Sequence, residues 1–254
     1  FIDALAKAAG RDLKPWAQEW LYQPGVNVLA ADFDCADGKI SRFTLRQSAA
    51  NPDYPTLREQ LVQVALFDLD GGKIVLNAKQ PVTYSGAATQ VPELIGKACP
   101  ALVYPNYEDW GFAEVQLDDR SFATARSSLS KTDDVMLRSM LWQSLSDGLR
   151  TQRVALDDYI DAVLANTPSE TDPALVRQAL TGATAAEDLL RVYSAGKPSA
   201  KVKKYAAAAG KRLEDMVWAG MLAHAGNRDQ ARSWFDTYVE IANTPEAMAR
   251  LRAI

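Results

Sequence analysis

Residues 101–119, ALVYPNYEDWGFAEVQLDD, mark the place where the pattern of this sequence changes. Before this segment, short apolar runs are separated by Gly, Pro and Asp pairs, and after it one helix-period segment follows another. The segment predicts a strand at 101–104, a tight turn at 105–111 and a strand at 112–117, because Pro-Asn and Asp-Trp-Gly interrupt two β-rich runs. We therefore expect the last hairpin of a sheet domain here, followed by a helical domain.

The composition is close to that of an average globular protein. The 254 residues are 48% hydrophobic and 24% charged, with a net charge of -4, and this length suffices for one large domain or two ordinary ones. So mild a charge gives no reason to expect nucleic acid or an anionic membrane as a partner. No apolar run approaches the length that a bilayer crossing requires.

The two cysteines are far apart in the sequence, at Cys35 and Cys99. We interpret them as buried free thiols of a reducing compartment rather than as a lone disulfide. The corresponding expectation for location is cytoplasmic.

Residues 1–22 predict two short helices that are separated at Gly10. Asp12 is the expected N-cap of the second helix, and Pro15 fits its first turn, where the missing N–H costs nothing. Both ends of the sequence fall inside helix-period patterns, so we expect a piece of a longer protein.

Residues 26–117 are rich in short β-type runs. Asp37-Gly38 and Asp70-Gly71-Gly72 each predict a hairpin. Several short strands at this spacing favour a β-sandwich. The expected strands are 26–33, 39–47, 61–69, 73–76, 82–84, 89–91, 101–104 and 112–117.

Residues 121–254 predict only helices. Asp172-Pro173 is an N-cap followed by Pro, Gly182 is the expected end of that helix, and Thr184 with Glu187 forms an expected capping box for the next one. Short connections favour antiparallel neighbours in a stacked array. The fold class predicted is α+β with several domains, a β-sandwich followed by an all-α array of helical hairpins. The other expected segments are 122–129, 133–149, 156–164, 213–223, 229–242 and a last helix opened by Thr244-Pro245.

Four strings carry a resemblance to a known family: GRDLKPWAQEWLYQPGV (10–26), PTLREQLVQVALFDLDGG (55–72), LRSMLWQSLSDGL (137–149) and ANTPSETDPALV (165–176). Together with the Asn that precedes Gly-Phe in the segment 101–119, they resemble the C-terminal portion of zinc aminopeptidases of the aminopeptidase N family. The resemblance implies three parts. Residues 1–24 are then the last helices of a truncated catalytic domain, 25–119 the β-sandwich, and 120–254 a truncated helical C-terminal domain.

The chemistry of that family is not carried by this chain. A zinc site of this type needs H-E-x-x-H on a helix, whereas the sequence holds one histidine, His224. We interpret His224 as a surface residue near a helix end rather than as a metal ligand. We therefore expect no catalytic residue, no metal ligand and no cofactor here, with zinc in the parent enzyme, and the sequence does not identify substrate-binding residues.

Other clusters favour structural interpretations. Asp68 and Asp70 lack the spacing of a calcium loop and belong to a hairpin turn. The lysines beside Tyr205 are expected on a solvated helix face rather than as a platform for single-stranded nucleic acid. The tryptophans are expected as core anchors, except Trp110, which lies in a turn. The lysines are Lys197, Lys201, Lys203 and Lys204, and the other tryptophans are Trp16, Trp20, Trp142, Trp218 and Trp234.

The resemblance implies a function for the parent as a hydrolase of the metalloprotease class that removes N-terminal residues from peptides. This chain would then form the wall and roof of the substrate chamber, with its own catalytic domain and peptide substrates as partners, and would be inactive alone. The alternative is an independent helical array that binds a protein or peptide.

Overall fold

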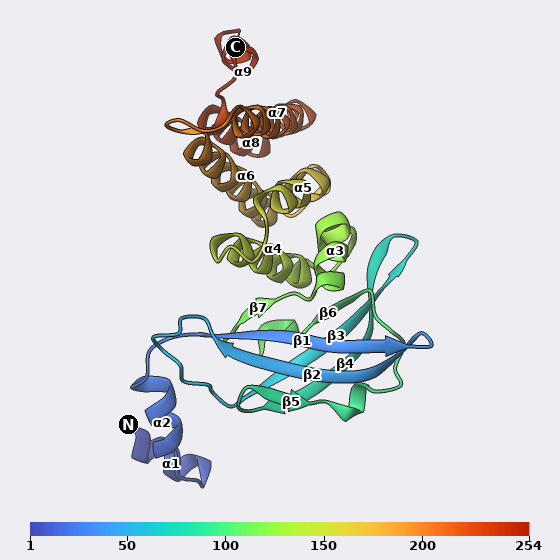
Figure 1. The fold of residues 1–254 in the computed structure, drawn as a ribbon, viewed down its shortest axis with the longest axis vertical. Coiled ribbons are helices and arrows are strands. Elements are labelled where there is room, and N and C mark those ends of the chain that lie inside the picture. Colours follow the sequence, from blue (N-terminus) through green and yellow to red (C-terminus); the bar gives the residue numbers. More distant parts are fainter. Residues whose placement is uncertain (254) are drawn as a thin grey trace. The chain divides into compact units, whose positions relative to one another are not determined.

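The computed structural model describes residues 1–253, and the chain forms two compact units, Phe1–Phe122 and Ala123–Ile254. The first unit contains two short helices and two sheets, and the second is helical (Figure 1). Within the described residues no strand follows residue 116. The predicted class, a β-sandwich followed by a helical array, is confirmed.

The N-terminal helices are α1 (Ile2–Ala9) and α2 (Lys14–Leu21). Gly10 separates them as predicted, with a positive φ of 64° that ends α1. The predicted cap was wrong, because Leu13 rather than Asp12 is the N-cap of α2. Asp12 instead accepts a hydrogen bond from the Lys14 backbone N at 2.9 Å, in a turn that precedes the helix.

A buried arginine joins α2 to the sandwich. Arg58 is 4% exposed, and its Nε donates to the Glu19 carbonyl at 3.0 Å while Nη2 donates to the Gln23 carbonyl at 2.8 Å. Nη1 donates to Asn27 Oδ1 at 3.3 Å, and the guanidinium lies 5.4 Å from the ring centre of Trp20. The cation thereby satisfies carbonyls at the end of α2, where the helix dipole is negative.

The sandwich consists of a sheet with the order β5-β2-β1-β7 and a sheet with the order β4-β3-β6 (Figure 1). Side chains from both sheets form its core, among them Leu29 and Phe43 from one and Val64, Leu66 and Val103 from the other. The strands are β1 (Asn27–Ala36), β2 (Lys39–Ala49), β3 (Gln60–Asp70), β4 (Lys73–Tyr84), β5 (Ala88–Gln90), β6 (Leu102–Tyr104) and β7 (Glu114–Gln116).

Both predicted Asp-Gly hairpins are present, between β1 and β2 and between β3 and β4. The predicted strands 73–76 and 82–84 are in fact parts of one strand, β4. Pro81 lies inside it, and Pro is tolerated there because β4 is an edge strand that needs no second ladder partner.

The expected hairpin over 101–117 is wrong. β6 pairs antiparallel with β3, with Val103 opposite Leu66, whereas β7 pairs parallel with β1, with Val115 opposite Leu29. The two strands therefore belong to different sheets. The turn between them carries the chain across the sandwich instead of folding it back on itself.

Asn106 holds this crossing turn in shape. It is 2% exposed, its Nδ2 donates to the Gly111 carbonyl at 2.7 Å, and its Oδ1 accepts from the Gly111 N at 2.8 Å. A Cβ on Gly111 would lie 2.7 Å from Val62 Cγ1, so only glycine fits against β3 at this point. Glu108 and Asp109 have positive φ values of 63° and 54°, which shows how tightly the turn is constrained.

The cysteine prediction is also wrong, because Cys35 and Cys99 form a disulfide. Lys39, at the start of β2, forms an isolated bridge with Ala98, and Cys99 N donates to the Gly38 carbonyl at 2.9 Å. This pairing brings Cys99 beside the β1–β2 turn. The separation of 64 residues in sequence concealed the contact.

The helical unit runs from α3 to α9, with helices that follow each other after short connections. They are α3 (Asp119–Ser128), α4 (Val135–Arg150), α5 (Leu156–Asn166), α6 (Pro173–Ser194), α7 (Ala200–Ala223), α8 (Arg228–Ile241) and α9 (Pro245–Arg252). The short 3-10 helices among residues 1–253 are η1 (Pro92–Leu94), η2 (Tyr107–Asp109), η3 (Leu129–Lys131) and η4 (Thr167–Ser169).

The start of α6 was predicted correctly and its end was not. Asp172 Oδ1 accepts from the backbone N of Ala174 at 2.8 Å, as the cap requires. The helix then continues through Gly182, because the missing side chain lets α5 approach: a Cβ there would lie 2.4 Å from the Tyr159 hydroxyl. Thr184 is not a cap but lies inside α6 and donates to the Leu180 carbonyl at 3.4 Å.

A buried ion pair fixes α4 against the segment that precedes α6. Arg138 Nε donates to Glu170 Oε2 at 2.9 Å, and the two side chains are 7% and 1% exposed. Glu170 Oε1 also accepts from the backbone N of Thr171 and Asp172. Removing one partner of such a pair leaves the other charged and buried, which is strongly destabilising.

We predict that Asn106→Ala lowers the free energy of unfolding by about 2–3 kcal/mol, because two buried backbone groups of Gly111 lose their partner. Urea unfolding measures the change. The matched control is Asn51→Ala, since Asn51 is exposed and accepts a single bond from the Asp53 N; it should cost less than about 1 kcal/mol. Equal costs for the two variants would show that the turn does not depend on Asn106.

We predict that the purified chain, denatured without reductant, has an intact mass lower than the thiol form by two hydrogens. Replacing both cysteines, Cys35→Ser with Cys99→Ser, should lower the free energy of unfolding by about 2–4 kcal/mol, as for a bond that closes a loop of this size. Alkylation of both cysteines in denatured, unreduced protein would contradict the bond.

Candidate functional site

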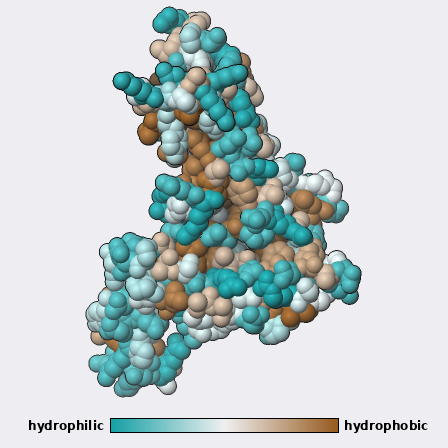
Figure 2. Space-filling model, in the orientation of Figure 1, coloured by the Kyte–Doolittle hydropathy of each residue, from teal (hydrophilic) through white to brown (hydrophobic). Residues whose placement is uncertain are grey.

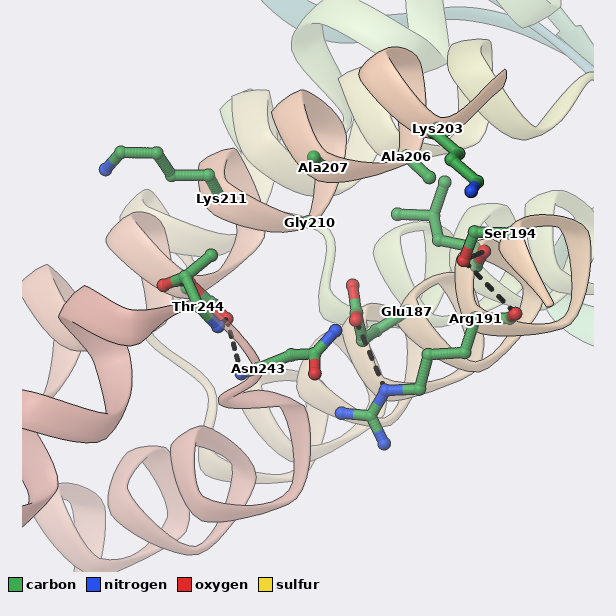
Figure 3. A pocket seen from close by; sticks show the side chains of 12 residues that line it. Glu187, Arg191, Ser194, Lys203, Ala206, Ala207, Gly210, Lys211, Asn243 and Thr244 are labelled. Atoms are coloured by element: carbon green, nitrogen blue, oxygen red, sulfur yellow. Dashed lines mark hydrogen bonds and ion pairs between the residues drawn. The ribbon is translucent and has the colours of Figure 1, made fainter. Parts of the chain in front are cut away.

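The helical unit contains a pocket of about 220 Å³ between α6, α7 and the connection from α8 to α9. Figure 3 shows its lining side chains. We call it the Glu187 pocket. Its lining residues are Glu187, Leu190, Arg191 and Ser194 of α6, Lys203, Ala206, Ala207, Gly210, Lys211 and Glu214 of α7, and Asn243 and Thr244 of the connection.

Glu214 has a structural role at one side of the pocket. Its Oε1 accepts from the backbone N of Asn243 at 2.6 Å and of Thr244 at 2.8 Å, and its Oε2 accepts from the Thr244 hydroxyl at 2.5 Å. Thr244 in turn caps α9 through the Ala247 N at 3.1 Å. The carboxylate is buried and fully engaged, so it holds the connection in place rather than awaiting a ligand.

Glu187 is buried and only partly satisfied. It is 3% exposed, and its Oε1 accepts from Arg191 Nε at 3.3 Å. Its Oε2 is buried and has no hydrogen-bond partner in the part of the chain that the structure describes. In Figure 3 one oxygen faces Arg191 and the other faces away from it, toward α7. A buried acceptor left in this way costs about 1–3 kcal/mol.

Gly210 makes the room in which this oxygen stands. A Cβ at position 210 would lie 2.9 Å from Glu187 Oε2, so any larger residue would press on the carboxylate. The small residues Ala206 and Ala207 lie one turn earlier on α7. The glycine of α7 thereby lets the helix backbone lie close to the Glu187 carboxylate.

Burial dominates the electrostatics of Glu187. It raises the pKa of the carboxyl group; the nearby Arg191 guanidinium opposes the shift, and the negative charges of Glu214 and Asp188 add to it. The pocket therefore holds one carboxyl group that binds its proton more tightly than an exposed glutamate does.

The cations at the pocket differ in how they are engaged. Arg191 also donates through Nη2 to the Glu240 carbonyl at 2.8 Å. Lys211 forms an ion pair with Asp215 at 2.5 Å. The hydrogen bond to the Asp215 carboxylate is the main reason why the pKa of Lys211 is raised. Lys203 is exposed, and its ammonium has no ion-pair partner among residues 1–253; Figure 3 shows it near Ser194.

The arrangement supports binding rather than bond cleavage. Its lining has no histidine and no cysteine, and the Thr244 hydroxyl, which donates to Glu214 Oε2, also accepts from the Ala247 N and so serves as the cap of α9. Figure 2 shows mainly hydrophilic side chains on the visible face of the C-terminal helices, at the top of the view. A polar ligand is therefore a better match for this region than an apolar one.

Two further hollows among residues 1–253 can be compared with it. One lies between α6 and α8 and is lined by Arg177, Asp188, Asp236 and Glu240 among others. The second is bounded by α2 and the sandwich and includes Trp16, Trp20 and Glu59. Neither contains a buried polar atom without a partner, so neither is a stronger candidate.

The residues singled out from the sequence are not brought together in one site. His224 is the C-cap of α7, which agrees with the expected position near a helix end. Its Nδ1 forms a hydrogen bond with the Gly220 carbonyl at 2.8 Å, and its ring stacks on Trp234. Residues 1–253 contain no group of three or more His, Cys, Asp and Glu side chains that could hold a metal. Of the lysine cluster, only Lys203 lines the Glu187 pocket.

The tryptophans range from buried to exposed, with Trp20 and Trp218 half-buried. Trp142 and Trp234 are fully buried, as expected of core anchors, and Trp110 is 47% exposed, in keeping with its place in the turn. Trp16 was expected in the core but is 38% exposed. The reason is local, since the buried face of α2 is formed by Ala17 and the N-cap Leu13.

The sequence interpretation missed Glu187 as a pocket residue. Its position three residues after Thr184 suggested a capping box, and that pattern hid its burial. The available signal was its place on the apolar face of a long helix, three residues before Leu190 and four after Ala183. A charged side chain is rarely buried at such a position unless it has a partner or a function.

Comparison with known proteins gives two matches. The family described as ERAP1-like C-terminal domain matches residues 102–252. Over its whole length the chain is similar to aminopeptidase N of Streptomyces lividans, with 33% identity over 260 residues. The chain spans 29% of the length of that protein.

We predict that Glu187→Gln stabilises the chain progressively as the pH rises. Because its pKa is raised in the folded state, Glu187 contributes less to stability as pH rises from its unfolded pKa through its folded one. Relative to the wild type, the variant should gain little free energy of unfolding at about pH 4.5. At about pH 8 it should gain about 1 kcal/mol or more. Urea unfolding at both values measures it.

The matched control for this measurement is Glu93→Gln, which changes an exposed carboxyl of the other unit. It should show no such trend with pH. A pH-independent difference for Glu187→Gln would contradict a raised pKa at this position.

Proposed function

This chain belongs to the aminopeptidase N family, and we propose that it is the non-catalytic C-terminal part of a zinc aminopeptidase that removes N-terminal residues from peptides. The observation that carries the proposal is the similarity to one aminopeptidase N over all of this chain but only 29% of that protein. A chain with one histidine cannot supply the two imidazoles of an H-E-x-x-H site. Bond cleavage would therefore belong to the remaining part of the parent.

We assign the chain a role in access to the substrate. The sandwich and the helical unit would form the wall and roof of a chamber that admits short or unfolded peptides, with the catalytic domain of the parent as their partner. The helical unit suits this role, because its helices are held by buried polar contacts such as Arg138–Glu170 and so present a firm surface. The two helices within residues 1–24 would then be the last part of the catalytic domain, joined to the sandwich through Arg58.

The zinc of such an enzyme does not fit the residues of this chain. Cys35 and Cys99 are bonded to each other, and His224 Nδ1 is engaged with the Gly220 carbonyl. We therefore place zinc only in the parent, with ligands outside this chain, and derive no step through the metal here.

A cytoplasmic location stays a prediction, and the disulfide argues against it. The prediction assumed reduced thiols, whereas bonds such as Cys35–Cys99 persist mainly in oxidising compartments. As for the membrane, none of the helices described in residues 1–253 combines the length and apolar character of a bilayer crossing.

A second candidate function is an independent module that binds a peptide or protein. One observation favours it: the Glu187 pocket is lined by helices of a single unit and is complete within this chain. The two functions differ in whether the chain depends on an upstream catalytic part.

We predict that the chain alone binds no stoichiometric zinc and does not cleave an aminoacyl reporter, because it lacks a ligand set for the metal. Co-expressed with the portion of its own gene that lies upstream, it should co-purify with that portion as a complex that holds zinc and cleaves the reporter. Metal analysis and reporter assays on the chain, the upstream portion and the complex provide the comparison. The control is the complex with the histidines of the upstream H-E-x-x-H motif replaced.

Two results would contradict the proposal. One is tightly bound zinc in the chain alone at one ion per chain. The other is an upstream portion that neither associates with this chain nor contains the motif, which would favour the independent module.

A further inference from the structure

We propose that the Glu187 pocket binds a small zwitterion, a free α-amino acid, with the ammonium group of the ligand on Glu187 and its carboxylate at Lys203. The site goes beyond the proposed function, and its assignment rests on the pocket alone. Free amino acids are also the products of the proposed parent reaction, so an occupied site would report product concentration.

The charges that remain unpartnered determine the ligand class. Glu214 is fully engaged by Asn243 and Thr244, and Lys211 is paired with Asp215. Among the charged groups that line the pocket, two are left over in the described residues: the buried Oε2 of Glu187 and the ammonium of Lys203. Glu187 Oε2 can accept a hydrogen bond from a donor, and the Lys203 ammonium can bind an anion. A ligand that carries both an ammonium and a carboxylate offers a partner to each.

The ammonium end of the ligand matches the floor of the pocket. Glu187 is 3% exposed, and its Oε1 is held by Arg191, so its side chain is fixed, while Oε2 lies buried close to Gly210 as an acceptor without a partner in the described residues. A charged donor on a buried carboxylate makes one of the stronger hydrogen bonds available in proteins. It would also favour the ionised form of Glu187, against the effect of burial.

The carboxylate end matches the rim. Lys203 lies opposite α6, and Ser194 lies beside it in Figure 3. Ser194 Oγ donates to the Leu190 carbonyl at 2.7 Å, so its hydroxyl is oriented by the helix and Lys203 is the group left to meet an anion.

The size of the pocket sets a limit on the ligand. A volume of about 220 Å³ equals that of roughly seven water molecules. A small or medium-sized amino acid fits this space. Leu190 and Ala206 supply the apolar part of the lining, against which a short aliphatic side chain can pack.

Calorimetric titration of the whole chain with L-alanine tests the proposal, with glycine and L-leucine as further probes. We expect saturable binding with a dissociation constant of about 1 mM or tighter. Two matched compounds separate the charges of the ligand. L-alaninamide lacks the carboxylate and propionate lacks the ammonium, and each should bind about tenfold more weakly or worse.

Variants then locate the site. Glu187→Gln and Lys203→Ala should each weaken L-alanine binding about tenfold or more. Lys201→Ala, on the same helix but outside the pocket lining, and Glu93→Gln, in the other unit, should leave it unchanged. If Glu187→Gln perturbs folding, the Lys203→Ala titration tests the site by itself. Lys203 is exposed and makes no described side-chain bond whose loss could unfold the chain.

Three outcomes would overturn the proposal: no saturable binding of any of the three amino acids, binding that survives both pocket variants, or propionate or L-alaninamide binding as tightly as L-alanine. These titrations use the chain alone, without the upstream portion or zinc. A failure here therefore leaves the test of the aminopeptidase role unaffected, and a failure of that test leaves this one standing.

Discussion

The sandwich depends on the segment that runs from β6 to β7. This one stretch supplies a strand to each sheet, antiparallel to β3 in one and parallel to β1 in the other. Asn106 shapes the turn between them, and Ser121 Oγ accepts from the Val103 N at 2.8 Å, which ties the first turn of α3 back to β6. Neither sheet is complete until this segment is in place, so closure of the sandwich and the start of the first long helical run are coupled.

Local sequence patterns predicted elements well where the deciding contacts are local. The Asp-Gly turns, the Asp172-Pro173 and Thr244-Pro245 helix starts and the change from strands to helices were all present. The errors at Asp12 and Trp16 are local to α2, whereas the larger failures share one cause, which is contact between residues distant in sequence. Turn residues indicated where the chain bends at 105–111 but not that its flanking strands join different sheets. Likewise Gly182 continues a helix because Tyr159 packs on it, and Cys99 meets Cys35 across 64 residues.

The candidate site could not be predicted for the same reason. The Glu187 pocket is assembled from α6, α7 and the α8–α9 connection, and no spacing within one segment reveals it. The residues that carried the family resemblance are of another kind. Asn106 holds a turn and Glu170 forms a buried ion pair. Structural positions of this sort explain how a chain that lacks an H-E-x-x-H motif can still be assigned to an enzyme family.

The parallel pairing of β7 with β1 is the feature on which the sandwich most depends, and nuclear Overhauser effects between backbone protons measure it directly in a deuterated sample. The structure predicts cross-strand signals between the Leu29 and Val115 regions, together with signals between Leu66 and Val103. Signals that instead connect residues of β6 with residues of β7, as in a hairpin, would contradict the crossing.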